Sequence, residues 1–195
     1  MGARRERGGG VARSMAEVAG FAALAVACGF ALHAVPNVEL ITLTAFSSGV
    51  FLGVGRGALV GALSMLLFST VNPLGPAALP ILGAQVGAMA AAGVLGGLEG
   101  PWLSRRLGDL GRRSVVGLAA LGVTGVVLTL FYDFSTNAAM AVLLADSHAA
   151  FWTLVLSGVA FSALHVVSNA LVFTVMGGAA VRALVHWRRV GPGGG

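Results

Sequence analysis

The stretch HAVPNVELITLTAFSSGVFLG, residues 33–53, contains the feature that decides the fold. Most of it is apolar enough to lie in lipid, yet its first residues include Pro36, Asn37 and Glu39. Proline and asparagine are typical of turns and helix starts. The stretch therefore predicts a turn followed by an apolar helix, and it raises the question of what a carboxylate does at the start of that helix.

The composition of the whole chain indicates an integral membrane protein. Of its 195 residues, 57% are hydrophobic and only 10% are charged, and the mean hydropathy is +0.91. Soluble domains carry about 25% charged residues, so this chain has too little charge to cover a water-facing surface. The single cysteine, Cys28, excludes an intrachain disulfide framework and a cysteine-cluster metal site.

Apolar runs between polar breaks predict an all-α membrane protein with six transmembrane helices. A span needs about 20 mostly apolar residues, and the absence of period-two alternation favours helices over a barrel. We expect a disordered basic tail over 1–14, a six-helix domain over 15–186 and a flexible tail over 187–195. The expected spans are roughly 15–35, 38–54, 57–72, 79–98, 115–133 and 150–181.

The distribution of basic residues predicts the orientation of these helices. All twelve are arginines, in groups at 4–13, at 56, at 105–113 and at 182–189. Six spans place all four groups on one side, whereas the connections on the other side contain no arginine or lysine. The positive-inside rule then predicts a multi-pass protein of the cell membrane with both termini in the cytoplasm. Topology and contact with anionic lipid explain the net charge of +5, so we do not expect nucleic acid as a partner.

Small residues repeat along one face of the first predicted helix. They stand at every fourth position, which gives a smooth groove suited to close helix contact. The groove could pack inside this chain or dock another membrane subunit. This alanine ladder consists of Ala19, Ala23, Ala27 and Ala31.

Two polar stripes occur on the last two predicted spans, at the same spacing. Asp133, Thr136 and Asn137 stand at i, i+3 and i+4, and so do His165, Ser168 and Asn169. Polar side chains in a bilayer usually face the bundle interior or a wet cavity. The stripes predict one shared polar patch, either a binding site or interhelical hydrogen bonds that hold the bundle together.

Motifs for catalysis or nucleotide binding are absent from the sequence. There is no HExxH, no GxSxG elbow and no GxxxxGK[ST] loop. One histidine among amides does not make a metal site. We therefore expect neither an enzyme nor a bound metal or cofactor.

Several segments together resemble one family of membrane proteins. They are PNVELITLTAFSSGVFLGVGRGALVGALSMLLFSTVNPLGP, AQVGAMAAAGVLGG, YDFSTN and HVVSNALVF. With the six-helix topology, they are similar to the substrate-binding S component of energy-coupling factor (ECF) vitamin transporters. The likeness is one of overall pattern and covers roughly residues 15–185.

The resemblance implies high-affinity capture of a vitamin or related micronutrient from outside the cell. It implies docking on a transmembrane T component that carries two ATPase subunits, with the alanine ladder as the contact. A pocket in the outer halves of the later helices and the outer loops would by position use Asn37, Glu39, Asn72, Gln85, Tyr132, Asp133, Asn137, His165 and Asn169.

Aromatic residues near the predicted pocket could form its walls, since small-molecule pockets are largely apolar. Phe131, Tyr132, Phe151 and Trp152 are the candidates, although Phe151 and Trp152 could instead belong to the aromatic belt at a helix start. Glu39 and Asp133, with no basic residue on that side, favour a neutral or cationic ligand or one rich in hydrogen-bond donors.

Three alternatives remain open from sequence. Glu39 could rim a pocket, or it could only stabilise the first turn of the second helix, with Asn37 as the cap. The chain could be a structural or assembly subunit of a membrane complex, without a ligand. It could also be an intramembrane enzyme that uses His165 and Asp133.

Overall fold

The computed structural model describes residues 2–35, 37–73, 75–108, 112–145 and 147–190. The described residues form helices and no strand, as the sequence predicts. In chain order the helices are α1 (Gly2–Leu32), α2 (Ile41–Leu52), α3 (Val54–Val71), α4 (Leu79–Leu107), α5 (Arg112–Leu144), α6 (His148–Ser157), α7 (Val159–Val172), the π-helical turn η1 (Phe173–Gly177) and α8 (Gly178–Val190).

Five helical segments are long and apolar enough to cross a membrane, where the sequence predicts six. They are Gly10–Leu32, Val54–Val71, Leu79–Leu107, Ser114–Leu144 and Phe161–Trp187. The second predicted span is shorter than expected, because α2 has only 12 residues. At 1.5 Å per residue it is about 18 Å long, against a hydrocarbon core of about 30 Å.

Local chemistry explains why α2 is short. The segment 33–40 before it contains Asn37, whose positive φ of 59° interrupts helical geometry. At its other end Gly53 has φ 88°, a conformation that glycine adopts without steric cost. Gly53 turns the chain directly from α2 into α3.

The end of α5 also differs from the sequence prediction. α5 continues to Leu144, so most of the loop expected over 134–149 is helical. The hydroxyl groups of Ser135 and Thr136 donate to the carbonyls of Phe131 and Tyr132 at 2.6 and 2.9 Å, which satisfies these polar side chains inside a continuing helix.

The tails are also more helical than expected. α1 begins at Gly2, where a disordered tail over 1–14 is predicted. No proline interrupts this stretch, and Arg13 pairs with Glu17 one turn on, at 3.2 Å. α8 extends to Val190, and residues 191–195 of the predicted C-terminal tail lie outside the described residues.

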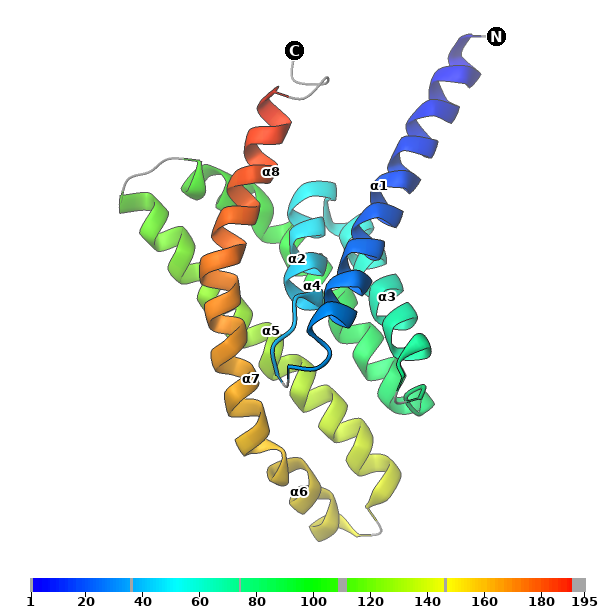
Figure 1. Cartoon of the computed structure of the whole chain (residues 1–195), viewed down its shortest axis with the longest axis vertical. Helices are drawn as coiled ribbons and strands as arrows, with labels where there is room; N and C mark the ends of the chain where they lie inside the picture. The colour runs from blue at the N-terminus through cyan, green and yellow to red at the C-terminus, as the bar shows by residue number, and fades with distance from the viewer. Residues whose placement is uncertain (1, 36, 74, 109–111, 146, 191–195) are drawn as a thin grey trace.

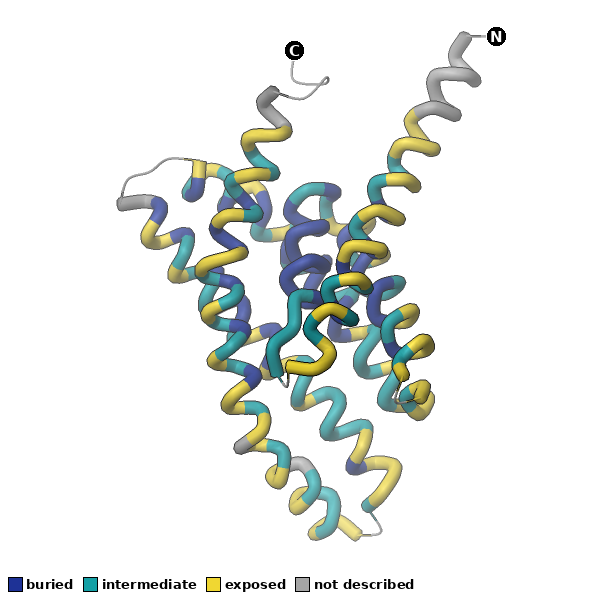
Figure 2. The backbone as a smooth tube through the Cα atoms, viewed as in Figure 1, coloured by how far each residue is buried: buried dark blue, intermediate teal, exposed yellow. Residues whose placement is uncertain are grey.

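The short helix α2 is the centre of the molecule (Figure 2). All its residues except Phe51 are buried, as expected for a helix that is apolar all round. Phe46 packs on Phe173 of η1 with ring centroids 5.4 Å apart. α1, α3 and α4 surround it together with η1 and α8.

The helix ends divide the bundle into two halves (Figure 1). The first turns of α1, the α2–α3 junction and the last turns of α8 lie toward the same end of the bundle, so Arg13, Arg56 and Arg182 belong to the same half. We call this the arginine end. The last turn of α1, the last turn of α3, the first turn of α4 and the facing ends of α5 and α6 lie on the other side, at what we call the cavity end.

Candidate binding cavity

A cavity of about 450 Å³ lies at the cavity end, beyond the first residue of α2. Its walls come from α1, segment 33–40, α3, α4, α5 and α7, while Ile41 is the contribution of α2 among the described lining residues. The polar or aromatic side chains around it are His33, Asn37, Glu39, Phe68, Gln85, Tyr132, Asp133, Thr136, Asn137, Phe161, Ser162 and His165.

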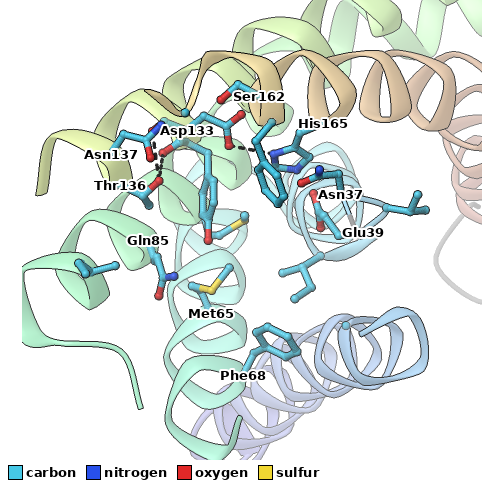
Figure 3. Close-up of a pocket in the computed structure, with 18 of the residues that line it drawn as sticks. Asn37, Glu39, Met65, Phe68, Gln85, Asp133, Thr136, Asn137, Ser162 and His165 are labelled. Atoms are coloured by element: carbon cyan, nitrogen blue, oxygen red, sulfur yellow. Dashed lines mark hydrogen bonds and ion pairs between the residues drawn. The ribbon is translucent and has the colours of Figure 1, made fainter. Parts of the chain in front are cut away.

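One wall holds an acid–histidine pair that joins α5 to α7 (Figure 3). Nδ1 of His165 lies 2.8 Å from Oδ1 of Asp133, and the two side chains are only 11% and 12% exposed. The ring of Tyr132 meets the imidazole edge-on, with centroids 6.2 Å apart. Oδ2 of Asp133 is buried without a hydrogen bond, so the pair leaves one acceptor unused.

Glu39 is held from two sides. Its Oε2 accepts from the backbone N–H of Thr42 at 2.9 Å, and its Oε1 accepts from Nδ2 of Asn169 at 3.2 Å. Asn169 also donates to Oγ1 of Thr129 at 2.9 Å. The carboxylate therefore satisfies a free N–H at the start of α2 and ties this start to α5 and α7.

This geometry corrects the capping role expected for Asn37. α2 begins three residues later than the predicted span, so Glu39 rather than Asn37 reaches its first turn. Asn37 instead takes a left-handed conformation, and its carbonyl accepts from the hydroxyl of Ser168. Segment 33–40 is thus fastened to α7 at two adjacent points, Ser168 and Asn169.

The opposite wall is formed by α3 and α4, where Figure 3 shows Met65, Phe68 and Gln85 across from the acid–histidine pair. Oε1 of Gln85 accepts from the hydroxyl of Ser69 at 2.8 Å. This bond fixes the orientation of the amide. The wall is otherwise apolar, with Met89 one turn beyond Gln85.

Seven of the nine predicted pocket residues line this cavity. Asn72 and Asn169 do not: Asn72 follows the last turn of α3, and Asn169 is buried behind Glu39, with 1% of its surface exposed. The other seven are Asn37, Glu39, Gln85, Tyr132, Asp133, Asn137 and His165.

The aromatic wall differs from the predicted one. Of the four predicted aromatics only Tyr132 lines the cavity, whereas Phe131 and Trp152 are 48% and 46% exposed. Phe68 and Phe161 take their place. Helical spacing could have indicated one of them, because Phe161 stands four residues before His165 and shares its face.

The alanine ladder lies on the outer surface of the bundle. Ala19, Ala23, Ala27 and Ala31 are all exposed, and the inward face of α1 is made of other residues: Val18, Ala22, Ala25 and Gly29. Of the two roles predicted for the ladder, packing inside this chain or docking another membrane subunit, the structure therefore excludes the first.

The cavity combines apolar and aromatic walls with a small number of fixed polar groups. None of the described residues that line it is an arginine or lysine. The described residues contain no group of three histidine, cysteine or acidic side chains placed to hold a metal ion. Such an arrangement is suited to binding a small organic molecule, with the polar groups fixing its orientation.

Comparison of the chain with protein-family models, with curated protein sequences and with solved structures found no match.

Proposed function

We propose that this protein is the substrate-binding S component of an ATP-driven ECF transporter and captures a vitamin-like molecule at the cavity end. The observation that carries the proposal is the cavity of about 450 Å³. Ligand pockets commonly measure about 300–1,000 Å³ and are mostly apolar with a few placed polar groups. A bundle whose polar residues served helix packing alone would not need a cavity of this size.

The position of the cavity supports uptake from outside. It lies opposite the arginine end, and arginine-rich segments face the cytoplasm by the positive-inside rule. In this orientation both termini are cytoplasmic, and α2 with segment 33–40 completes a sixth, partial crossing. A molecule arriving from outside would meet segment 33–40 and the ends of α3, α4 and α5.

The exposed alanine ladder supports a second membrane subunit as partner. Small residues let helices approach closely in a membrane, and Ala23 and Ala27 are open to such an approach. With no nucleotide-binding motif in the chain, ATP would be hydrolysed by two ATPase subunits bound to the T component.

The test is co-purification of this chain with an ECF T component and its ATPases, followed by ATP-dependent uptake in vesicles. Ala23→Leu should reduce the amount of T component recovered without lowering the melting temperature. Leu24→Phe, at a neighbouring position that is 53% exposed, is the control and should reduce it less. Purification of the wild-type chain without any T component would contradict the proposal. Recovery of equal amounts of T component with both variants would contradict the alanine ladder as the contact.

The Asp133–His165 contact favours a second candidate function, an intramembrane enzyme. A carboxylate that orients an imidazole at 2.8 Å is an arrangement used by general bases. This candidate predicts turnover of a lipid substrate by the purified chain without ATP, abolished in His165→Ala. The transporter proposal predicts no such turnover.

A further inference from the structure

The cavity has an excess of negative charge. With histidines counted as neutral, the described lining residues include two carboxylates, Glu39 and Asp133, and no arginine or lysine. Protonation of His165 would balance one of them, since it contacts Asp133 directly. The second carboxylate makes no ion pair among the described residues.

Glu39 is that second charge. The described ion pairs are Arg13–Glu17, Arg56–Glu17 and Asp133–His165, and none includes Glu39. Its two hydrogen-bond donors, the Thr42 backbone and the Asn169 amide, are neutral groups. A partly buried carboxylate in a membrane protein is costly unless a positive charge pairs with it.

The neighbouring unused groups are acceptors as well. Oδ2 of Asp133 and Oδ1 of Asn169 are buried without a hydrogen bond. Both oxygens carry partial negative charge, so neither of them offsets the carboxylates at this end of the bundle. A ligand that carries a carboxylate would face two negative charges.

The aromatic lining fits a cation too. Tyr132, Phe68 and Phe161 reach the cavity from three different helices. The face of an aromatic ring attracts a cation, most strongly where water is excluded. Figure 3 shows Glu39 beside the acid–histidine pair with Phe68 across the cavity, so a bound cation would lie between carboxylate and ring.

We propose that the substrate is an organic cation with one positive charge, a protonated amine or a cationic heteroaromatic ring, and that Glu39 is its counter-ion. This inference rests on the proposed function, because it assigns a substrate class to the same cavity. It excludes micronutrients whose recognised group is a carboxylate or phosphate.

The test uses the purified full chain in detergent and, as probe, the water-soluble small-molecule extract of the cells that express it. Compounds retained by the immobilised protein are released by denaturation, separated by ion exchange and identified by mass spectrometry. The proposal expects a retained compound with a positive charge at pH 7. A retained compound that is neutral or anionic would overturn it, while leaving ligand capture intact.

Two variants assign the charge to Glu39. Glu39→Gln keeps an acceptor oxygen for Thr42 and should weaken binding of the retained compound by roughly tenfold to a hundredfold, because a charge-assisted bond is lost. Glu99→Gln is the matched control, since Glu99 is also a carboxylate within the bundle, bonded to Thr124 at 3.0 Å, but does not line the cavity.

The outcomes separate the two proposals. Equal weakening by both variants, or full binding by folded Glu39→Gln, overturns Glu39 as counter-ion. No retained compound at all overturns ligand capture itself, and the substrate class with it.

Discussion

The two ends of the α3–α4 pair show how one pair of helices can be both tightly packed and open. Toward the arginine end, Gly57 and Gly61 of α3 face Gly93 and Met89 of α4 so closely that a Cβ on Gly93 would overlap the carbonyl oxygen of Gly57. Toward the cavity end, the facing positions are Met65, Phe68 and Gln85, which line the cavity. Small residues bring the backbones together, and large ones replace them where space is needed.

The short α2 reinforces this difference. It fills the arginine half with buried side chains and begins at Ile41, where the cavity starts. The cavity thus occupies the space that the rest of a full-length second span would fill. Glu39 lies at this boundary. It bonds to the first turn of α2, which belongs to the packed half, and it lines the cavity.

The largest effect is expected from a methyl group in the packed half. Gly93→Ala should destabilise the protein by about 3 kcal/mol, because the new Cβ overlaps backbone atoms of α3 that cannot move independently. Gly87→Ala on the same helix is the control: its Cβ would meet nothing within 4 Å, and helix propensity favours alanine by up to about 1 kcal/mol. Unfolding in detergent measures both, and equal stabilities would show that glycine packing does not hold this half.

An intermediate effect is expected where the two halves meet. Asn169→Ala removes the hydrogen bonds to Glu39 and Thr129 and should cost about 2 kcal/mol, because these buried groups lose a partner. Asn137→Ala, which changes a cavity-lining amide, should change stability by less than about 0.5 kcal/mol. A bundle in which both amides only hold helices together would lose comparable stability in both variants, which thermal unfolding would reveal.

The smallest effect is expected from the ion pairs at the surface of the arginine end. Arg56 lies 3.3 Å from Glu17, but the two side chains are 45% and 28% exposed. Exposed pairs contribute about 0–1 kcal/mol. Glu17→Gln should therefore lower stability by no more than about 0.5 kcal/mol, and less at high salt. A loss as large as that of Gly93→Ala would mean that charge, not packing, joins α1 to α3.

The sequence predicts much of this fold because membrane helices have a strong apolar signal. The limits of α2 are harder to predict, since LITLTAFSSGVFLG is equally apolar in a short buried helix and in a span. The continuation of α5 past Asp133 is also hard to predict, because Ser135 and Thr136 are residues typical of loops. In the structure their hydroxyl groups bond to carbonyls of the same helix.

The candidate site is likewise only partly predictable from the sequence. Charged and amide residues at helical spacing, such as Asp133 and Asn137, indicate which faces meet. The apolar walls carry no comparable signal, because Met65, Phe68 and Met89 look like any core or lipid-facing residue until the helices are placed. Asn169 shares its stripe with His165, yet packing places it behind Glu39 and outside the cavity.

The most direct test of the account is native mass spectrometry of the purified protein, released from detergent with its bound small molecule. The account predicts one small molecule per chain in the wild type, reduced occupancy in Asn137→Ala, and unchanged occupancy in Asn72→Ala, whose residue does not line the cavity. A folded wild-type protein that carries no small molecule and takes none up from a cell extract would contradict it, as would equal occupancy in all three proteins.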